Sequence, residues 1–329
     1  MIKNNLPFEV YGNKDLIQDK KPVCITFGNF DGVHLGHKHL IESMKSMVQN
    51  SPIVIVTFDP HSSDYFSPHN QKSLLTNLSN KISLLLSYGA SAVVVQKFDE
   101  KFASLTADDF CEHWLNTNFN INYVILGHDF CYGKNRQGDF SHMESYGEKQ
   151  GWIVSQISAL EDSITKKEPV SSSIIRNEIS LGNMENVENL LGRPYTLSGI
   201  VVHGDHKGRG IGFPTANLKL DCNYVIPKHG VYACFIEIDY EDTRGTKLFP
   251  AVMNCGVRPS MSDGLKLQIE AHILNFDEDI YEKKIKFYPK KYIRGEQKFS
   301  DLEQLKKQIC EDIISANLYF NDNIHTNPH

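Results

Sequence analysis

The turn on which the fold depends reads GNFDGVHLGH, residues 28–37, and it directly follows a short apolar run at residues 23–27. Its glycines and Asp31 permit unusual backbone angles and let a ligand approach the chain closely. His34 and His37 then enter the next predicted helix three residues apart, so both rings lie on one face. This order predicts a helix N-terminus whose backbone N–H groups and partial positive charge face an anionic ligand.

The rest of the first half repeats the order of strand and helix. Apolar runs rich in Val, Ile and aromatic residues alternate with stretches of helical periodicity, as in the βαβ units of a parallel sheet. We therefore predict a Rossmann-like α/β domain, with ligands bound beyond the carboxyl ends of the strands. The expected strands are residues 23–27, 53–58, 92–95, 123–126 and 152–157, and the expected helices are residues 37–48, residues 80–88 and a stretch that begins with a capping box between Thr106 and Asp109.

The second half changes character near residues 180–195. Its strand-like runs are separated by turns with little helical pattern, which predicts a small antiparallel β-barrel. A C-terminal helix is expected from Ser300, with a capping box to Glu303. We expect one domain at residues 1–186 and a second at 187–329. The expected barrel strands are residues 199–202, 230–238, 249–253, 266–274 and 284–288.

Composition narrows the class of protein. At about 150 residues per domain, a chain of 329 residues is expected to hold two domains. Lys and Arg number 34 against 40 Asp and Glu, a net charge of −6, which argues against a nucleic-acid partner. No apolar stretch has the length of a signal peptide or a membrane span, so no membrane partner is expected. Seven scattered cysteines without a C-x-x-C pair are typical of reduced thiols in a cytoplasmic protein.

A second candidate site begins the barrel half with VHGDHKGRGIGFPTAN, residues 202–217. It matches neither the Rossmann dinucleotide fingerprint nor the P-loop, but a glycine-rich turn with Lys207 is able to cradle phosphates. Thr215 and Asn217 are two residues apart on a predicted strand, so their oxygen atoms share one face and suit Mg²⁺. Taken alone, this segment also reads as an ordinary hairpin turn, and GNFDGVHLGH as a βα turn with two surface histidines.

Taken together, these motifs resemble those of the bacterial bifunctional riboflavin kinase/FAD synthetases over roughly residues 20–310. The adenylyltransferase half is similar in GNFDGVHLGH and in VTFDPH (56–61), LGHDFCYGKNRQGD (126–139) and VSSSIIR (170–176). The kinase half is similar in VHGDHKGRGIGFPTAN and in IPKHGVYA (226–233), NCGVRPS (254–260), LQIEAHILNFDEDIY (267–281) and RGEQKF (294–299).

The resemblance and the residue chemistry together give the candidate site residues. Glu270 matches the family's catalytic base, and the other predicted catalytic residues are His34, His37 and Arg176. Nucleotide and phosphate binding is expected from Gly28, Asn29, Phe30, Asp31, Gly32, Ser172, Ser173, Gly204, Lys207, Gly208, Gly210, Gly212 and Asn217. Flavin contacts are expected from Phe58, Asp59, Asp129, Phe130 and Arg294, and Mg²⁺ ligands from Thr215 and Asn217.

The family's activity implies two successive reactions. The barrel would phosphorylate riboflavin with ATP and Mg²⁺ to give FMN and ADP. The first domain would then adenylylate FMN with a second ATP to give FAD and pyrophosphate, by direct in-line attack. Two alternatives stay open at this point: a monofunctional enzyme in which one site works, and a flavin-binding regulator without turnover. The oligomeric state is also left open.

Overall fold

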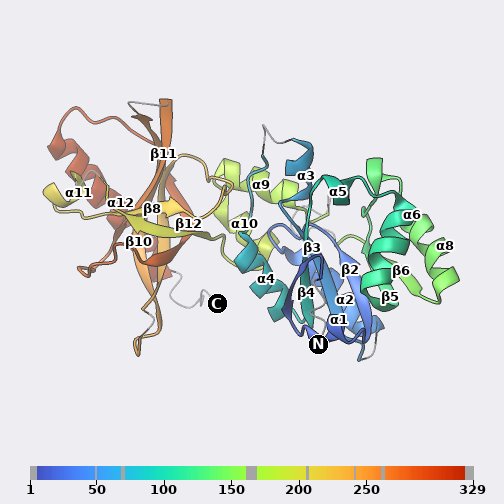
Figure 1. Cartoon of the computed structure of the whole chain (residues 1–329). Helices are drawn as coiled ribbons and strands as arrows, with labels where there is room; N and C mark the ends of the chain where they lie inside the picture. The colour runs from blue at the N-terminus through green and yellow to red at the C-terminus, as the bar shows by residue number, and fades with distance from the viewer. Residues whose placement is uncertain are drawn as a thin grey trace. The chain divides into compact units, whose positions relative to one another are not determined.

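A computed structural model describes residues 6–48, 50–67, 71–160, 169–204, 207–240, 242–260 and 264–322 (Figure 1). The chain divides into two compact units. One comprises Met1–Lys72 and Thr76–Ser171, and the other comprises Ser73–Leu75 and Ser172–His329. The domain boundary expected after residue 186 stays a prediction.

The first unit is built on a six-stranded sheet with the order β1-β4-β3-β2-β5-β6. All neighbours pair in parallel except β1, which runs antiparallel to β4. The predicted α/β fold and its five strands are confirmed; β1 was not predicted. The strands are β1 (Glu9–Gly12), β2 (Pro22–Phe27), β3 (Ile53–Asp59), β4 (Ala92–Lys97), β5 (Asn120–Gly127) and β6 (Ile153–Ile157).

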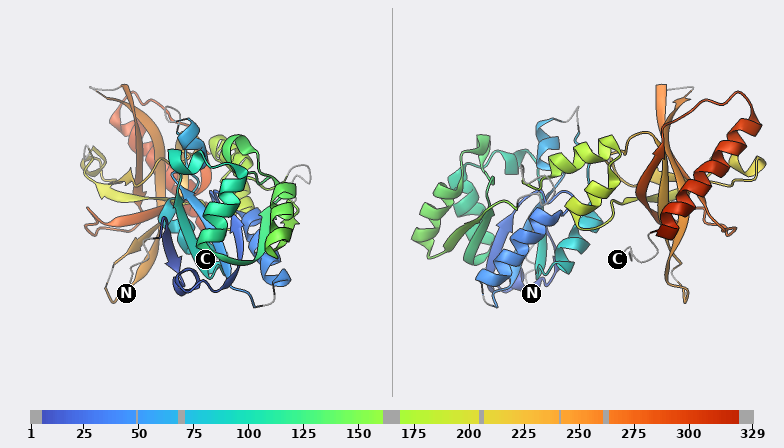
Figure 2. Two further views of the ribbon diagram at one scale, coloured as in Figure 1. Left: turned by 45° about the vertical axis from the view of Figure 1, so that its right-hand side comes forward. Right: turned by 180° about the vertical axis from the view of Figure 1, so that it is seen from behind.

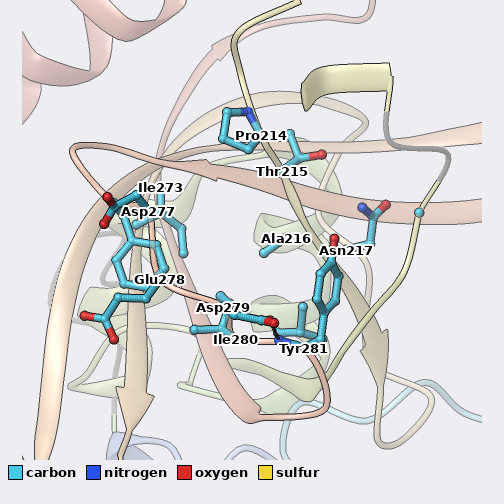
Figure 3. Close-up of a pocket in the computed structure, with 13 residues that line it drawn as sticks. Pro214, Thr215, Ala216, Asn217, Ile273, Asp277, Glu278, Asp279, Ile280 and Tyr281 are labelled. Atoms are coloured by element: carbon cyan, nitrogen blue, oxygen red, sulfur yellow. Dashed lines mark hydrogen bonds between the residues drawn. The ribbon is translucent and has the colours of Figure 1, made fainter. Parts of the chain in front are cut away.

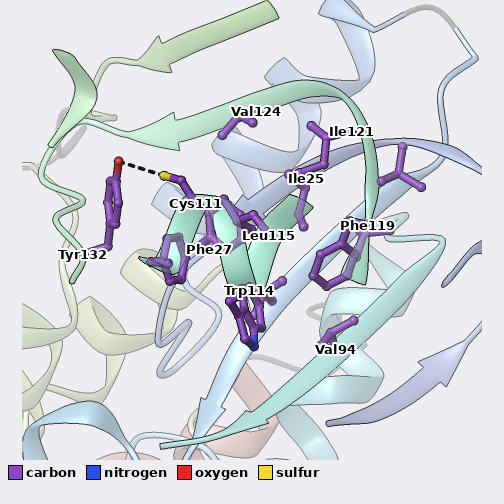
Figure 4. Packing of buried hydrophobic residues seen from close by; sticks show 14 of the residues in the cluster. Ile25, Phe27, Val94, Cys111, Trp114, Leu115, Phe119, Ile121, Val124 and Tyr132 are labelled. Carbon is purple, nitrogen blue, oxygen red and sulfur yellow. Dashed lines mark hydrogen bonds between the residues drawn. The ribbon is translucent and has the colours of Figure 1, made fainter. Parts of the chain in front are cut away.

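Alternation along the strands produces two apolar cores, one on each face of this sheet. Val23 and Ile25 of β2 face one core, while Cys24 between them faces the other. Successive side chains of a strand point to opposite faces, so a strand buried on both sides reads as a continuous apolar run. Figure 4 shows the first core, where Ile25 and Phe27 pack with Trp114 and Leu115.

Helices cover both faces of the sheet. The expected helices at 37–48 and 80–88 are confirmed as α2 (Leu35–Met47) and α4 (Leu78–Ser87). The capping box of Thr106 and Asp109 is present, but only one α-helical turn follows it before the chain widens into a π-helix, Phe110–Leu115. The remaining helices of the unit are α1 (Asp15–Gln18), α3 (Ser62–Phe66), α5 (Glu100–Ala103), α6 (Ala107–Asp109), α7 (Asn116–Asn118), the 3₁₀ turn Lys134–Arg136 and α8 (Phe140–Gln150).

The second unit contains the predicted barrel, which closes in the order β10-β11-β8-β7-β12-β9 with antiparallel pairing throughout. Two helices, α9 (Ser172–Leu181) and α10 (Met184–Leu191), precede it in the chain. The strands are β7 (Leu197–Val202), β8 (Ala216–Leu220), β9 (Gly230–Asp239), β10 (Thr246–Ser260), β11 (Gly264–Ile273) and β12 (Lys284–Arg294).

The expected C-terminal helix is α12 (Leu302–Asp322), and Figure 2 shows it lying along the barrel strands. Ala316 and Phe320 pack with Val231 and Val252 of the barrel. The predicted cap was wrong, because the Gln304 N–H donates to Asp301 Oδ1 at 2.9 Å. Asp301 is therefore the capping residue, and the helix starts one residue later than the Ser300 capping box required.

No helix in the described ranges is both long and apolar enough to cross a membrane. The seven cysteines all lie in these ranges, and none of them forms a disulfide.

Candidate active sites

The first site lies where the chain leaves β2. In the sheet, β2 has β3 on one side and β5 on the other, so strand succession reverses direction beside it. Such a reversal opens a crevice at the carboxyl edge of a parallel sheet, which is where ligands bind in these folds. The turn at residues 28–34, which is predicted to bind phosphate, follows β2 directly and therefore lies at this edge.

The two histidines of this turn stack at the start of α2. Their ring centroids are 3.7 Å apart with an interplanar angle of 24°. The His34 N–H donates to His37 Nδ1 at 3.2 Å, so the neutral His37 ring carries its proton on Nε2. His34 is buried and His37 is half-buried. The arrangement holds an imidazole N–H donor beside a helix N-terminus, a combination suited to a phosphate.

Backbone geometry explains the residue types around the histidines. A side chain at Gly36 would meet the His34 ring at 3.1 Å, so the glycine makes room for that ring. Phe30 and Val33 adopt positive φ angles of 48° and 40°. Such conformations are costly for residues other than glycine, and for a β-branched residue above all, and they persist only where surrounding contacts hold them.

Hydrogen bonds hold Asn29 at both its backbone and its side chain. Its carbonyl accepts from Thr57 Oγ1 and from Lys81 Nζ, both at 3.1 Å. Its side chain donates from Nδ2 to Ser62 Oγ at 2.9 Å and accepts from the Ser62 N–H at 3.1 Å. Asp31 beside it is buried. The turn is therefore tied to the residues that follow β3.

The predicted flavin residues of this unit lie at the same edge of the sheet, two at the end of β3 and two after β5. Phe58 is buried against Phe98, whereas Asp59 is exposed. The Asp129 side chain is 83% exposed, and Phe130 stacks on Phe27 at 5.7 Å. Their flavin contacts stay predictions.

The predicted pyrophosphate residues start α9 in the second unit. Ser172 is the first residue of this helix and Ser173 the second. Arg176 donates from Nε to the carbonyl oxygen of Ser73 at 3.2 Å, within the same unit. Their action together with the two histidines stays a prediction.

The second site is on the outer face of the barrel, where β8 and β11 pair. Asn217 lies opposite Glu270 in this register. Thr215 Oγ1 is 3.4 Å from Glu270 Oε2, so three predicted residues come together. Gln268, which was not predicted, donates from Nε2 to Asn217 Oδ1 at 3.0 Å and to Glu270 Oε2 at 3.1 Å.

Strand alternation explains this cluster. Ile269 and Ala271 point into the barrel and are buried, so Glu270 between them points to the opposite face, as strand alternation predicted. Glu270 is half-buried. Gln268 lies on the same outward face, two residues before Glu270. The same strand alternation would have predicted the position of Gln268.

A pocket of about 390 Å³ adjoins the cluster. Figure 3 shows residues 214–217 along one wall and Asp277, Glu278 and Tyr281 on the segment across from them. Of the predicted residues, Gly204, Thr215 and Asn217 line it. The wall at residues 276–281 was not assigned a role from the sequence, because its side chains belong to a loop without periodicity.

The glycine-rich segment folds partly as a short helix, α11 (Lys207–Gly210). A Cβ at Gly204 would lie 2.4 Å from the Asn217 amide, and one at Gly208 would lie 2.4 Å from the Phe213 carbonyl oxygen. Both glycines therefore permit close packing beside the site. Gly212 has a φ of 92°, and a Cβ at Gly210 would meet nothing. The Lys207 side chain lies outside the part of the structure that is described.

Arg294, a predicted flavin contact, joins the barrel to α12. Its Nε and Nη2 donate to the two oxygens of the buried Asp312 carboxylate, both at 2.7 Å. A bidentate pair of this kind fixes the guanidinium plane. The structure gives Arg294 this packing role, and a flavin contact stays a prediction.

Together, the two sites define a two-domain transferase of phosphate-bearing groups. A histidine pair sits at a helix N-terminus on a parallel sheet, and a carboxylate, a hydroxyl and two amides gather beside a pocket on a barrel. A family model described as FAD synthetase matches residues 16–174, and one described as riboflavin kinase matches residues 191–320. The chain belongs to the family of bifunctional riboflavin kinase/FMN adenylyltransferases, as its motifs predicted.

Relatives of that name match nearly the whole chain. The protein of Escherichia coli K12 is 35% identical over 314 residues, which cover 94% of this chain and 97% of its own length. That of Bacillus subtilis 168 is 34% identical over 311 residues, covering 93% and 95%. A crystal structure titled as a macrolide-efflux protein from Streptococcus pneumoniae is 28% identical, with a TM-score of 0.79 over 90% of this chain and 94% of that one.

Proposed function

We propose that this chain makes FMN from riboflavin and ATP on the barrel, and then makes FAD from FMN and a second ATP on the α/β unit. The observation that carries this proposal is that each unit presents its own family motif as an assembled cluster. Thr215, Asn217 and Glu270 gather beside a pocket. His34 and His37 stack at the start of α2.

In the kinase reaction, Glu270 accepts the proton of the ribityl 5′-hydroxyl as its oxygen attacks the γ-phosphorus of ATP. The new oxygen–phosphorus bond forms as the bond to the β-phosphate oxygen breaks, and ADP leaves. Gln268 Nε2 at 3.1 Å and Thr215 Oγ1 at 3.4 Å orient the Glu270 carboxylate. The glycine-rich segment from Gly204 lets the nucleotide phosphates approach the backbone.

Mg²⁺ fits the oxygen atoms at this site. Thr215 Oγ1 and the Asn217 Oδ1 are half-buried hard donors on one face of the chain. Mg²⁺ prefers oxygen ligands and is usually completed by water and substrate phosphates rather than by a protein cage. When bound, the ion would offset negative charge on the phosphates. Among the described residues, no group of three or more His, Cys, Asp or Glu side chains is placed to hold a metal.

In the adenylyl transfer, an FMN phosphate oxygen attacks the α-phosphorus of ATP and pyrophosphate leaves. The phosphate is already a nucleophile, so the site needs positioning and charge stabilisation rather than a base. The His37 Nε2–H and the N-terminus of α2 would stabilise the α-phosphate, while Ser172, Ser173 and Arg176 would bind the leaving pyrophosphate.

An exposed aromatic group offers a place for the isoalloxazine ring. Phe66 of α3 is 67% exposed, and its ring centroid lies 5.9 Å from that of Phe98. Tyr65 lies 5.8 Å from Phe98 and completes the group. These residues follow β3 and β4 at the carboxyl edge of the sheet, and large exposed aromatic side chains are suited to stack on a flat ring.

We expect Phe66→Ala to raise the KM for FMN about 10-fold while kcat for FAD formation changes less than about 3-fold, because stacking holds substrate and transition state equally. Steady-state assays with supplied FMN and ATP measure both constants. Ile153→Ala removes another exposed apolar side chain from the same unit and is the matched control. An unchanged KM in Phe66→Ala contradicts the flavin contact.

The function itself is tested by a time course with riboflavin, ATP and Mg²⁺, in which riboflavin, FMN and FAD are separated by chromatography. FMN that appears first and then gives way to FAD is the expected result. FMN alone would show a silent first unit, and unchanged riboflavin with FAD formed only from supplied FMN would show a silent kinase. The thiol composition also leads us to propose a cytoplasmic location.

A further inference from the structure

A buried cation contacts the turn at residues 28–34 of the first unit. Lys81, in the first turn of α4, is only 6% exposed. Among the lysines and arginines whose side chains the structure describes, it alone is buried. A buried ammonium loses its hydration, so it persists only where polar partners compensate for that loss.

Lys81 contacts two polar groups, a backbone carbonyl in the turn after β2 and a side-chain hydroxyl near the end of β3. Its Nζ donates to the Asn29 carbonyl oxygen at 3.1 Å and contacts Thr57 Oγ1 at 3.3 Å. Thr57 Oγ1 also donates to the Asn29 carbonyl oxygen at 3.1 Å. The three groups form a closed triangle that joins α4, the end of β3 and the turn after β2.

Two carboxylates face this ammonium from the same turn and from the end of β3. Burial lowers the pKa of Lys81, and the negative charges of Asp31 and Asp59 act in the opposite direction. Asp31 is itself buried at 2% exposure. The cation therefore offsets acidic charge at a place where anionic phosphates are expected to bind.

The turn that Lys81 contacts is the part of the site that requires support. Phe30 has a φ of 48° and Val33 one of 40°, and these residues separate Asn29 from the stacked His34. Positive φ angles in residues other than glycine are maintained only by contacts from outside the turn. The Asn29 carbonyl, which accepts two hydrogen bonds, is one fixed point of this turn, and the Asn29 side chain on Ser62 is the other.

We propose that Lys81 is a positioning residue for adenylyl transfer: it fixes the Asn29 carbonyl and so holds the Asn29–Val33 turn in the conformation that aims the His34–His37 pair. The inference rests on the proposed function of this site. Stability alone does not explain a lysine here, because an apolar side chain of similar length often replaces a buried charge without loss.

The test is Lys81→Met, which keeps the length of the side chain and removes the ammonium. We expect kcat for FAD formation from supplied FMN to fall about 30-fold, because groups that stabilise the transition state lose their alignment. The KM for ATP should change less than about 3-fold. Riboflavin phosphorylation by the same chain should keep its wild-type rate and serves as an internal control.

Two further variants separate positioning from loss of stability. Ile82→Val shortens the next residue of α4, which shares the apolar core of Phe30 and Val33 but has no polar group for the Asn29 carbonyl, and it should keep wild-type kcat at a slightly lower melting temperature. Thr57→Val removes the hydroxyl shared by Asn29 and Lys81, and should lower kcat in the same direction by a smaller factor. In the double variant the two effects should be less than additive, because both act on one carbonyl.

The possible outcomes test the role of Lys81 separately from the proposed function. A wild-type chain that makes no FAD overturns the proposed function. A wild-type chain that makes FAD, with Lys81→Met at unchanged kcat, overturns the role of Lys81 alone. If Lys81→Met does not fold, Thr57→Val decides, and unchanged kcat in that variant overturns the role.

Discussion

Replacing Glu270 by Gln should lower the rate of FMN formation by about 10²- to 10⁴-fold, the range over which a positioned general base accelerates a reaction. The substitution keeps the size of the side chain but removes its capacity to take the ribityl proton. Gln268 Nε2, which donates to Glu270 Oε2 at 3.1 Å, would then face an amide. The measurement is initial FMN formation from riboflavin and saturating ATP.

The chain contains its own control for this variant. FAD formation from supplied FMN occurs on the other unit and should be unaffected. Glu237→Gln is the matched control, since it neutralises a barrel carboxylate that contacts Lys286 and Tyr288 rather than the pocket. Equal loss of both activities in Glu270→Gln would point to general damage and would remove Glu270 from the role of base.

Local sequence patterns predicted the parts of both sites that lie within one strand or one turn. His34, Gly36 and His37 belong to a single strand–turn–helix, so their spacing was enough to predict a shared face. Thr215, Asn217 and Glu270 were placed by strand alternation and by the resemblance, and the register of β8 with β11 brings them together. In both cases the shared face follows from the regular period of a helix or a strand.

Contacts between distant segments were not predicted. Lys81 is 52 residues from Asn29 along the chain and reads in the sequence as one more polar residue of an amphipathic helix. The π-helix at Phe110–Leu115 follows a correct capping box and lies in the apolar core, where the Trp114 Nε1–H donates to Gln96 Oε1 at 3.0 Å. No local pattern encodes either feature.

The sequence-based prediction failed at a short strand and at a helix start for a related reason. Strand β1 has only four residues, too few for an alternation to be recognised, and its pairing with β4 is what stabilises it. At α12, Ser300 and Asp301 are both good capping residues, so composition did not choose between them.

Replacing His37 by Ala should lower the rate of FAD formation by about 10²- to 10³-fold, the loss seen when one donor to a developing charge is removed. FMN formation on the barrel should not change. His37 is suited to this role because its Nδ1 accepts the His34 N–H at 3.2 Å, so the neutral ring carries its proton on Nε2, the proposed donor to a phosphate. FAD formation from supplied FMN and ATP is the measurement, and His39→Ala on the same helix is the matched control.

Alanine at this position removes two things at once, the donor and the cap of α2. His37→Gln separates them, because a glutamine at the third helical position is able to accept the N-cap N–H as in an ordinary capping box. If His37 acts through its imidazole, Gln should lose about as much activity as Ala while recovering the melting temperature. If Gln restores a wild-type rate, the histidine serves only as a cap, and transition-state stabilisation would have to come from the helix N-terminus and from Arg176.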